Sequence, residues 1–291
     1  MIKKMCLALT ALSLIFTTSC SNDDDNSAPT NSNLTLNFDG LEVLGANYVY
    51  EGWIIVNGEP ISTGTFSDVS SAQTFSVNTA MLNAATQFVL SIEPAVDADP
   101  APANTKVLVG TFSGNSANLN STIVADFSNA TGSYILATPT DADDTNEASG
   151  IWFLNNSNGS PVAGLNLPTL SAGWQYEGWV VFNGIPVSTG TFIDPAMADD
   201  NAATSPYKGN LGNGPAFPGE DYLTGSAGGI NFPTDLKGTT IVISVEPMPD
   251  NSPLPFALKP LAHMVPESAE NHTVITMGEG PVVSVSGTAT R

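Results

Sequence analysis

The hydrophobic and polar positions of this chain follow short runs that end in turn residues. Residues 50–56, "YEGWIIV", and 61–66, "ISTGTF", are rich in β-branched and aromatic residues and flank Asn57-Gly58. Both central positions of a tight hairpin turn take a positive φ, which Asn and Gly tolerate, so this pattern predicts a β-hairpin. Pro60 has no backbone N–H, and this places the returning strand at the edge of a sheet.

The same plan returns later in the chain. Residues 172–194 repeat 14 of the 23 residues of 46–68, including the Asn-Gly turn and the proline that follows it. Further on, "FVLSIEP" (88–94) matches "IVISVEP" (241–247), and the offset between the copies grows from 126 to 153. We interpret this as a duplication, with 27 extra residues in the second copy.

These patterns predict an all-β protein with two tandem β-sandwich (Ig-like) domains. After the N-terminus we find no strongly amphipathic helical stretch of 12 or more residues, whereas short runs bounded by Gly, Pro and Asn are frequent. Domain 1 is expected at 34–125 and domain 2 at 126–291, with a long loop at 195–238. Further strands are expected at 87–93, 106–112, 239–246 and 258–264.

The first residues predict an export signal and a lipid anchor. Lys3 and Lys4 precede an apolar run of 11 residues, 6–16, and a bilayer-spanning helix needs about 20. "FTTSC" resembles a lipobox, in which a Cys after small residues is lipidated and becomes the mature N-terminus. We therefore expect a signal peptide at 1–19, lipidation of Cys20, and a lipidated tether at 20–33.

Two further observations fit a lipid anchor. The mature chain would hold a single Cys, so no internal disulfide can form, and a thioether explains this unpaired residue. The acidic run Asp23-Asp24-Asp25 resembles the signal that sends lipoproteins of some Gram-negative bacteria to the cell surface. The expected localisation is the outer membrane, exposed at the surface, with a periplasm-facing protein as the alternative.

The charge balance excludes some classes of partner. The chain has 7 Lys and Arg against 28 Asp and Glu, a formal net charge of −21, which becomes −23 once Lys3 and Lys4 leave with the signal. Binding to nucleic acid or to anionic lipid by charge needs a basic patch, so we expect neither. Solubility outside the cell explains such acidity, and divalent-cation binding is the alternative.

The chemistry-bearing residues give no catalytic signature. His263 and His272 belong to no metal-ligand or nucleophile motif, and no G-x-S-x-G occurs. Glu51 and Glu93 recur in the second copy, which favours a framework role at strand ends over paired catalytic carboxylates. We therefore expect no catalytic residues, no cofactor and no enzyme.

Aromatic and acidic clusters are the remaining candidates for a site. Trp53 and Trp179 occupy equivalent positions and are expected in the two cores, whereas Trp174 is the best candidate for an exposed aromatic. "DADDTNE" (141–147) gathers oxygen ligands, although it lacks the Gly and Glu of an EF-hand. A second acidic set lies in the long loop: Asp199, Asp200, Glu220 and Asp221. We expect solvated acidic loops and no metal site, with calcium as the open alternative.

The residues of the repeat also resemble a known family. "YEGWIIVNGEPISTGTF", followed by "FVLSIEP" and a Pro-rich stretch ending in "KVLVGTF", resembles the extracytoplasmic domain of anti-sigma-K factors, and the second copy does so through "YEGWVVFNGIPVSTGTF" and "ISVEP". The resemblance covers about 36–112 and 150–262 and implies external domains with a sensory role. Members of the family carry a sigma-binding region and a membrane-spanning helix, but here a lipoprotein signal stands in their place. No sigma factor is therefore expected as a partner.

Together these observations favour a non-catalytic envelope lipoprotein whose two domains bind or sense a ligand. A glycan, a peptide or calcium is each compatible with the sequence. A structural or adhesive surface protein is the alternative, and a glycan-active enzyme is a third. An aromatic groove would favour binding, a featureless surface the structural role, and two facing carboxylates in a cleft the enzyme.

Overall fold

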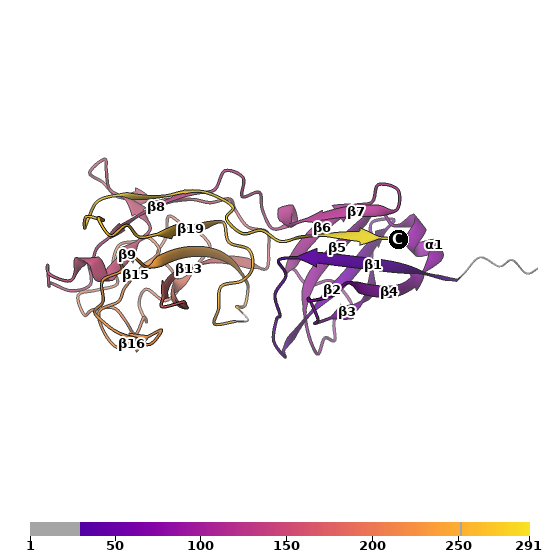
Figure 1. The fold of residues 1–291 in the computed structure, drawn as a ribbon, viewed down its shortest axis with the longest axis horizontal. Helices are drawn as coiled ribbons and strands as arrows, with labels where there is room; N and C mark the ends of the chain where they lie inside the picture. The colour runs from indigo at the N-terminus through magenta and orange to yellow at the C-terminus, as the bar shows by residue number, and fades with distance from the viewer. Residues whose placement is uncertain (1–29, 251) are drawn as a thin grey trace, which may run out of the picture.

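The protein folds into two β-rich lobes that lie side by side along its long axis (Figure 1). The structure is a computed structural model and describes residues 30–250 and 252–291. Helix is limited in this part of the chain to α1 (Thr79–Ala84) and two short 3-10 segments, η1 (Ser121–Ile123) and η2 (Glu147–Ser149). The all-β prediction is confirmed.

The N-terminal lobe is built on one eight-stranded sheet. The strand order is β3-β2-β5-β6-β7-β21-β1-β4, and the two end strands, β3 and β4, contact each other. The sheet therefore curls around a single core. Its strands are β1 (Asn31–Asp39), β2 (Tyr48–Val56), β3 (Glu59–Phe66), β4 (Gln73–Asn78), β5 (Gln87–Pro94), β6 (Lys106–Thr111), β7 (Ser116–Asn120) and β21 (Ser286–Thr290).

The C-terminal lobe has two larger sheets and two short hairpins. One sheet has the order β14-β13-β18-β19, with β13 (Trp174–Phe182), β14 (Ile185–Phe192), β18 (Thr240–Pro247) and β19 (Leu261–Met264). The other has the order β12-β8-β9-β15, with β20 also paired to β8. Its strands are β8 (Thr131–Leu136), β9 (Gly150–Trp152), β12 (Leu165–Asn166), β15 (Gly219–Asp221) and β20 (Ile275–Glu279). The hairpins pair β10 (Leu154–Asn155) with β11 (Val162–Ala163) and β16 (Ser226–Ala227) with β17 (Ile230–Asn231).

Both predicted hairpins form where the sequence places them. Asn57 and Asn183 have φ values of 53° and 51° and join β2 to β3 and β13 to β14. This left-handed backbone is the reason that Asn and Gly occupy the turns. The returning strands β3 and β14 end their sheets, so the edge position inferred from the prolines is confirmed.

Strand alternation decides which repeated aromatics reach the cores. Tyr50 and Tyr176 point into the main hydrophobic core, and each hydroxyl donates to a backbone carbonyl, of Glu42 and Pro168. Trp53 and Trp179 are buried too, but they lie three residues on and do not belong to that core cluster. Residues of odd separation lie on opposite faces of a strand. The prediction that these tryptophans are buried is confirmed, and they pack on the face of their sheets opposite the main core cluster.

A polar network on this second face is duplicated in the two lobes. The indole of Trp53 donates to Ser91 (2.8 Å), the Ser91 hydroxyl donates to Glu93, and Glu93 accepts the backbone N–H of Ala103 (2.9 Å). The C-terminal lobe repeats each step with the residues at equivalent positions, Trp179, Ser244, Glu246 and Phe256. The glutamate at each strand end therefore ties the Pro-rich connection to its sheet, which confirms the framework role.

The last strand departs from the predicted division of the chain. Residues 126–291 were assigned to the second domain, but β21 pairs with β1 and with β7 in the N-terminal lobe. The chain thus returns to the first lobe to complete its sheet (Figure 1). The predicted tether is also too long, because β1 begins at Asn31 and not after residue 33. The signal peptide, Cys20 and the acidic run 23–25 lie outside the described residues.

The predicted long loop at 195–238 is more ordered than expected. It contains β15, β16 and β17, and its Tyr222 is fully buried. Backbone bonds from Tyr222 to Ser149 (2.8 Å) and from Leu236 to Ala148 (2.9 Å) attach it to the segment before β9. The insertion is therefore part of the C-terminal lobe's packing. No helix within residues 30–250 and 252–291 has the length and apolar content needed to cross a bilayer.

Candidate functional site

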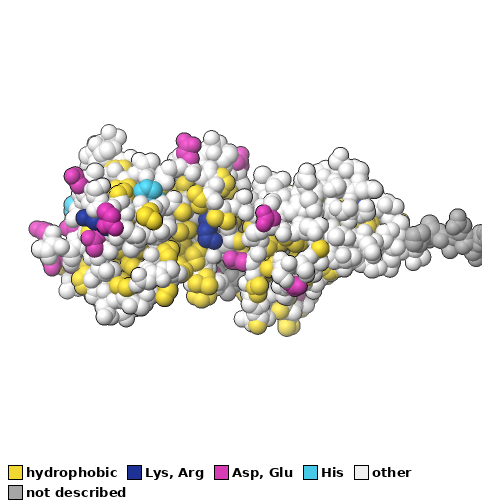
Figure 2. All heavy atoms as spheres, in the orientation of Figure 1, with side chains coloured by type: hydrophobic (Ala, Val, Ile, Leu, Met, Phe, Trp, Pro, Cys, Tyr) yellow, Lys and Arg dark blue, Asp and Glu magenta, His cyan; other side chains and the backbone are white. Residues whose placement is uncertain are grey.

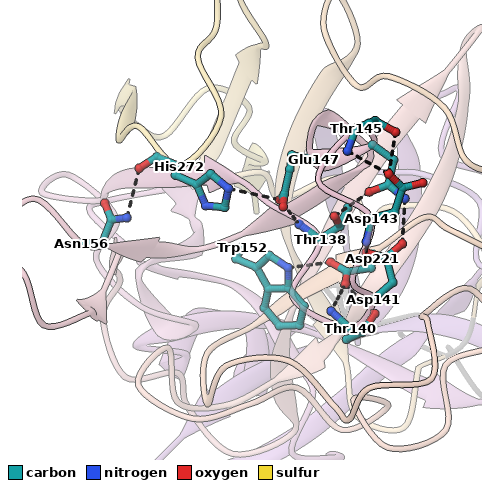
Figure 3. A network of polar contacts seen from close by, with 11 residues as sticks. Thr138, Thr140, Asp141, Asp143, Thr145, Glu147, Trp152, Asn156, Asp221 and His272 are labelled. Atoms are coloured by element: carbon teal, nitrogen blue, oxygen red, sulfur yellow. Dashed lines mark hydrogen bonds and ion pairs between the residues drawn. The ribbon is translucent and has the colours of Figure 1, made fainter.

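The acidic segment between β8 and β9 folds as a series of side-chain-capped turns (Figure 3). Asp143 accepts the backbone N–H (2.9 Å) and the hydroxyl (2.6 Å) of Thr145, and Asp141 accepts the side-chain amide of Asn146 (2.7 Å). Such local bonds are the ordinary use of Asp in turns. The pKa of Asp143 is lowered by its bonds to Thr145. Two of these carboxylates therefore serve to hold the turn.

Glu147 connects this segment to a distant part of the chain. Its Oε2 accepts the backbone N–H of Thr138 at 2.8 Å and lies 3.3 Å from Nε2 of His272. His272 has a φ of 60°, and its carbonyl accepts the side-chain amide of Asn156 at 3.0 Å. Glu147, through the imidazole, and Asn156, through the backbone carbonyl, are thus both held to His272, which lies 116 residues beyond Asn156 (Figure 3).

Asp221, which belongs to the insertion, binds residues close to the Glu147–His272 pair. It is fully buried, and it accepts the Trp152 indole at 2.7 Å and both the backbone N–H and the hydroxyl of Thr140, at 2.9 and 2.6 Å. Burial raises the pKa of Asp221 to about 6, although the bonds from Thr140 and Trp152 lower it. Three donors on a single buried carboxylate fix the position of the Trp152 ring.

Two glycines of the insertion allow the backbone to lie against that ring. A Cβ on Gly219 would come within 2.6 Å of Cε3 of Trp152, and one on Gly214 within 2.5 Å of Cζ2. Gly214 also has a φ of 76°, which favours glycine. Any larger residue at either position would push the ring away, so the insertion is shaped to cover Trp152.

These contacts leave a hollow of about 280 Å³, which we call the Trp152 hollow. This volume is near the lower end of the range for small-molecule sites. One wall is apolar and the other is polar. The apolar residues are Ile135, Ala137, Pro139, Trp152, Leu154, Pro161 and Pro215, and the polar ones are Thr138, Asp141, Glu147, Asn156 and His272.

The two predicted acidic sets differ in burial, since Asp143 and Asp144 of the first set are exposed and most of the second set is buried. In the described part of the chain, no three His, Cys, Asp or Glu side chains form a group that could hold a metal ion. Of the set in the insertion, Asp200 is exposed, whereas Asp199, Glu220 and Asp221 are buried. The expectation of a solvated loop is therefore wrong for these three residues, because the insertion folds inward.

Trp174, the best candidate for an exposed aromatic, is buried. It is 3% exposed and packs against Phe256 with ring centroids 5.6 Å apart. Phe256 comes from the Pro-rich connection after β18, which the Glu246 bond to its N–H holds over the sheet. Trp174 is therefore a core residue and carries no surface site.

The surroundings of the duplicated network differ between the lobes in how far the glutamate before Gly-Trp is exposed to solvent. In the N-terminal lobe, Glu51 and Trp53 line a hollow of about 400 Å³ together with Asp97 and Asp99. The residue equivalent to Glu51 is Glu177, which is 4% exposed. Burial raises the pKa of Glu177 to about 7 and that of Glu246 to about 8. The two copies thus differ in the exposure of the glutamate before Gly-Trp, which is half-buried as Glu51 and buried as Glu177.

These buried carboxyls predict that stability falls as pH rises. Burial also raises the pKa of Glu220 to about 8, so the folded chain binds more protons than the unfolded chain between about pH 4 and 8. Stability is then highest in mild acid and is lost as the pH rises through the folded-state pKa values. Thermal unfolding from pH 4 to 9 measures this. Glu246→Gln, which copies the neutral form, should flatten the slope by up to ~1.4 kcal/mol per pH unit, and an unchanged slope contradicts the assignment.

The first part of the chain matches the model of a known protein family. Residues 26–107 match the family model described as anti-sigma-K factor rskA, C-terminal. The match covers β1 to β5 and the start of β6, and it confirms the resemblance for the first copy. For the second copy the resemblance stays a prediction. No curated protein and no solved structure matches the chain.

Sequence reasoning missed the residues that make the Trp152 hollow. The sequence analysis names His272, Glu147 and Asp221 in separate motifs, but no pattern joins them to one another or to Trp152. One feature of the sequence could have pointed to them. Glu147, Trp152, Asp221 and His272 all lie outside the repeated blocks. Residues that a duplicated framework does not explain are therefore the ones that build this site.

Proposed function

We propose that this chain is a lipid-anchored envelope protein whose two β-rich lobes form a non-catalytic binding or sensing module. The observation that carries the proposal is the family match of residues 26–107. This segment follows directly on an N-terminus with the composition of a lipoprotein signal, and the acidic run after Cys20 favours surface exposure. The proposal includes no sigma-factor partner and no nucleic-acid partner.

The geometry supports binding over catalysis. The glutamates that could have formed a catalytic pair are held in the duplicated framework: Glu93 and Glu246 each accept a serine hydroxyl and a backbone N–H. The Trp152 hollow combines an apolar wall with a few convergent polar groups, which is the usual composition of a ligand site. This hollow is the feature that favours binding over a purely structural or adhesive role.

Figure 2 fits an exposed binding lobe. On this face, apolar side chains gather over the C-terminal lobe, and acidic side chains are dispersed around them. The described residues include several large apolar side chains on the surface of that lobe, such as Met197, Leu211 and Met264. Patches of this kind are typical of surfaces that contact ligands or partners.

The anchor is tested by replacing the lipidated residue. Cys20→Ala should move the protein from the membrane fraction to the soluble extract, because a thioether-linked lipid is the only anchor that the proposal contains. Fractionation followed by immunoblotting measures this. Cys6→Ala is the matched control and should stay in the membrane fraction. A Cys20→Ala protein that also stays there contradicts the anchor.

A further inference from the structure

The proposed function leaves the ligand open, and the walls of the Trp152 hollow restrict its chemistry. The apolar side presents three prolines, Pro139, Pro161 and Pro215, which lie over Trp152 and aliphatic side chains that are themselves buried. Rigid apolar rings make a surface suited to a flat or compact apolar body. At about 280 Å³ the hollow accepts one ring and not a chain of them.

Carboxylates dominate the charge of the polar side. It carries Asp141 and Glu147, the described lining contains no Lys or Arg, and its imidazole, His272, already contacts Oε2 of Glu147. Two further carboxylates, Asp143 and Asp144, belong to the same segment. An anion placed here would meet these carboxylates without a neighbouring Lys or Arg, whereas a cation would be attracted.

One carboxylate oxygen is available for direct contact. Oε2 of Glu147 is used by the Thr138 N–H and by His272, but Oε1 has no hydrogen-bond partner within the described residues. The Glu147 side chain is 16% exposed, so the group stands at the boundary of the hollow. The Thr138 bond holds this carboxylate in place before any ligand arrives, which lowers the cost of binding.

We propose that the Trp152 hollow binds a compact aromatic amine, with the ring against the proline wall above Trp152 and the ammonium at Glu147. This rests on the proposed binding function and adds the class of ligand. The ammonium gains a charge-assisted bond to Oε1, and the ring is removed from water. A neutral analogue keeps only the second contribution, and an anionic analogue is repelled.

Three ligands with the same ring test this proposal on the full mature chain: benzylammonium, benzyl alcohol and benzoate. Nuclear magnetic resonance of the ¹⁵N-labelled indole groups reports binding at Trp152, and the indole of Trp179 serves as the internal control because it is buried and bonded to the framework residue Ser244. Benzylammonium should shift the Trp152 signal with an affinity at least ~10-fold above that of benzyl alcohol, and benzoate should not shift it.

Two variants assign the charge preference. Glu147→Gln keeps an acceptor for Thr138 and should bring benzylammonium to within ~3-fold of benzyl alcohol. Asp144→Asn removes one charge three residues away, at an exposed position outside the lining, and should retain the preference. Melting curves establish that both variants are folded. If Glu147→Gln and Asp144→Asn behave alike, the contact with Glu147 is disproved.

The outcomes separate this inference from the proposed function. Equal binding of the three ligands at Trp152 overturns the cation preference and leaves a binding module. A Trp152 signal that none of them moves overturns the hollow as a site for compact aromatic ligands. The anchor is decided independently by the Cys20 fractionation.

Discussion

Deletion of residues 286–291 is expected to unfold the N-terminal lobe. These residues form β21 and Arg291, and β21 pairs with β1 and β7 over five residues on each side. The deletion removes a strand from within a continuous sheet and exposes both neighbours as new edges. At a net ~0.5–1.5 kcal/mol for each lost hydrogen bond, the loss is on the order of 5 kcal/mol or more, comparable with the whole stability of a domain.

Arg291 adds a clamp to this strand. Its guanidinium donates to the carbonyls of Leu82 (2.7 Å), Ala85 (2.8 Å) and Gly114 (3.0 Å), and it lies 4.4 Å from the centre of the Phe112 ring. The first two carbonyls belong to the end of α1, where backbone acceptors lack helical partners. The C-terminal strand is thereby fixed to a helix and a turn of the first lobe.

Urea unfolding followed by hydrogen exchange measures the effect of the deletion. Amides of β1 and β7 should lose protection, whereas those of β13 and β18 in the C-terminal lobe should keep theirs. Arg291→Ala is the control: it retains the strand pairing and should cost only ~1–3 kcal/mol. Unchanged protection of β1 and β7 in the truncated protein would show that the lobe does not depend on β21.

Asp221→Ala should have the second largest effect, because it removes the acceptor shared by three donors. The Trp152 indole and the two donors of Thr140 would be left without a partner in a buried position. Each unsatisfied buried donor costs about 1–3 kcal/mol, so we expect a loss of ~3–5 kcal/mol. The Trp152 ring would no longer be fixed, and ligand binding in the hollow should be lost with it.

Equilibrium unfolding and near-ultraviolet circular dichroism check this prediction. Asp221→Asn should lie between the wild type and Asp221→Ala, because an amide accepts through one oxygen and presents a second donor on its other side. Asp200→Ala changes an exposed carboxylate of the same insertion and should stay within ~0.5 kcal/mol of the wild type. A loss as large for Asp200→Ala as for Asp221→Ala would mean that the insertion responds to charge and not to the buried bonds.

The candidate site was only half visible in the sequence. The sequence analysis names the segment 141–147 for its oxygen ligands and the insertion for its extra residues and second acidic set, and both contribute to the Trp152 hollow. Their meeting was not predictable, because the bonds that Asp221 makes to Trp152 and Thr140 span 69 and 81 residues. No local pattern encodes a contact across that separation.

The sequence predicts the surroundings of the two kinds of tryptophan to different extents. The face on which Trp53 lies follows from the sequence, since Tyr50 and Trp53 differ by an odd number of residues and lie on opposite faces of one strand. The burial of Trp174 does not, because Phe256 and the connection that covers Trp174 arrive from 82 residues further on. Exposure depends on what folds over a residue as well as on its own strand.

By itself the sequence determined the local elements: the two hairpins, whose turns need the positive φ of Asn and Gly, the edge strands marked by proline, and the duplicated framework. Only the tertiary structure decided that β21 completes the first lobe and that the insertion buries Asp221. The residues of β21, "SGTAT", have too little apolar pattern to predict which strands they pair with. Turn and strand preferences act between neighbours in sequence, whereas pairing across the chain is decided by which surfaces the whole fold leaves open.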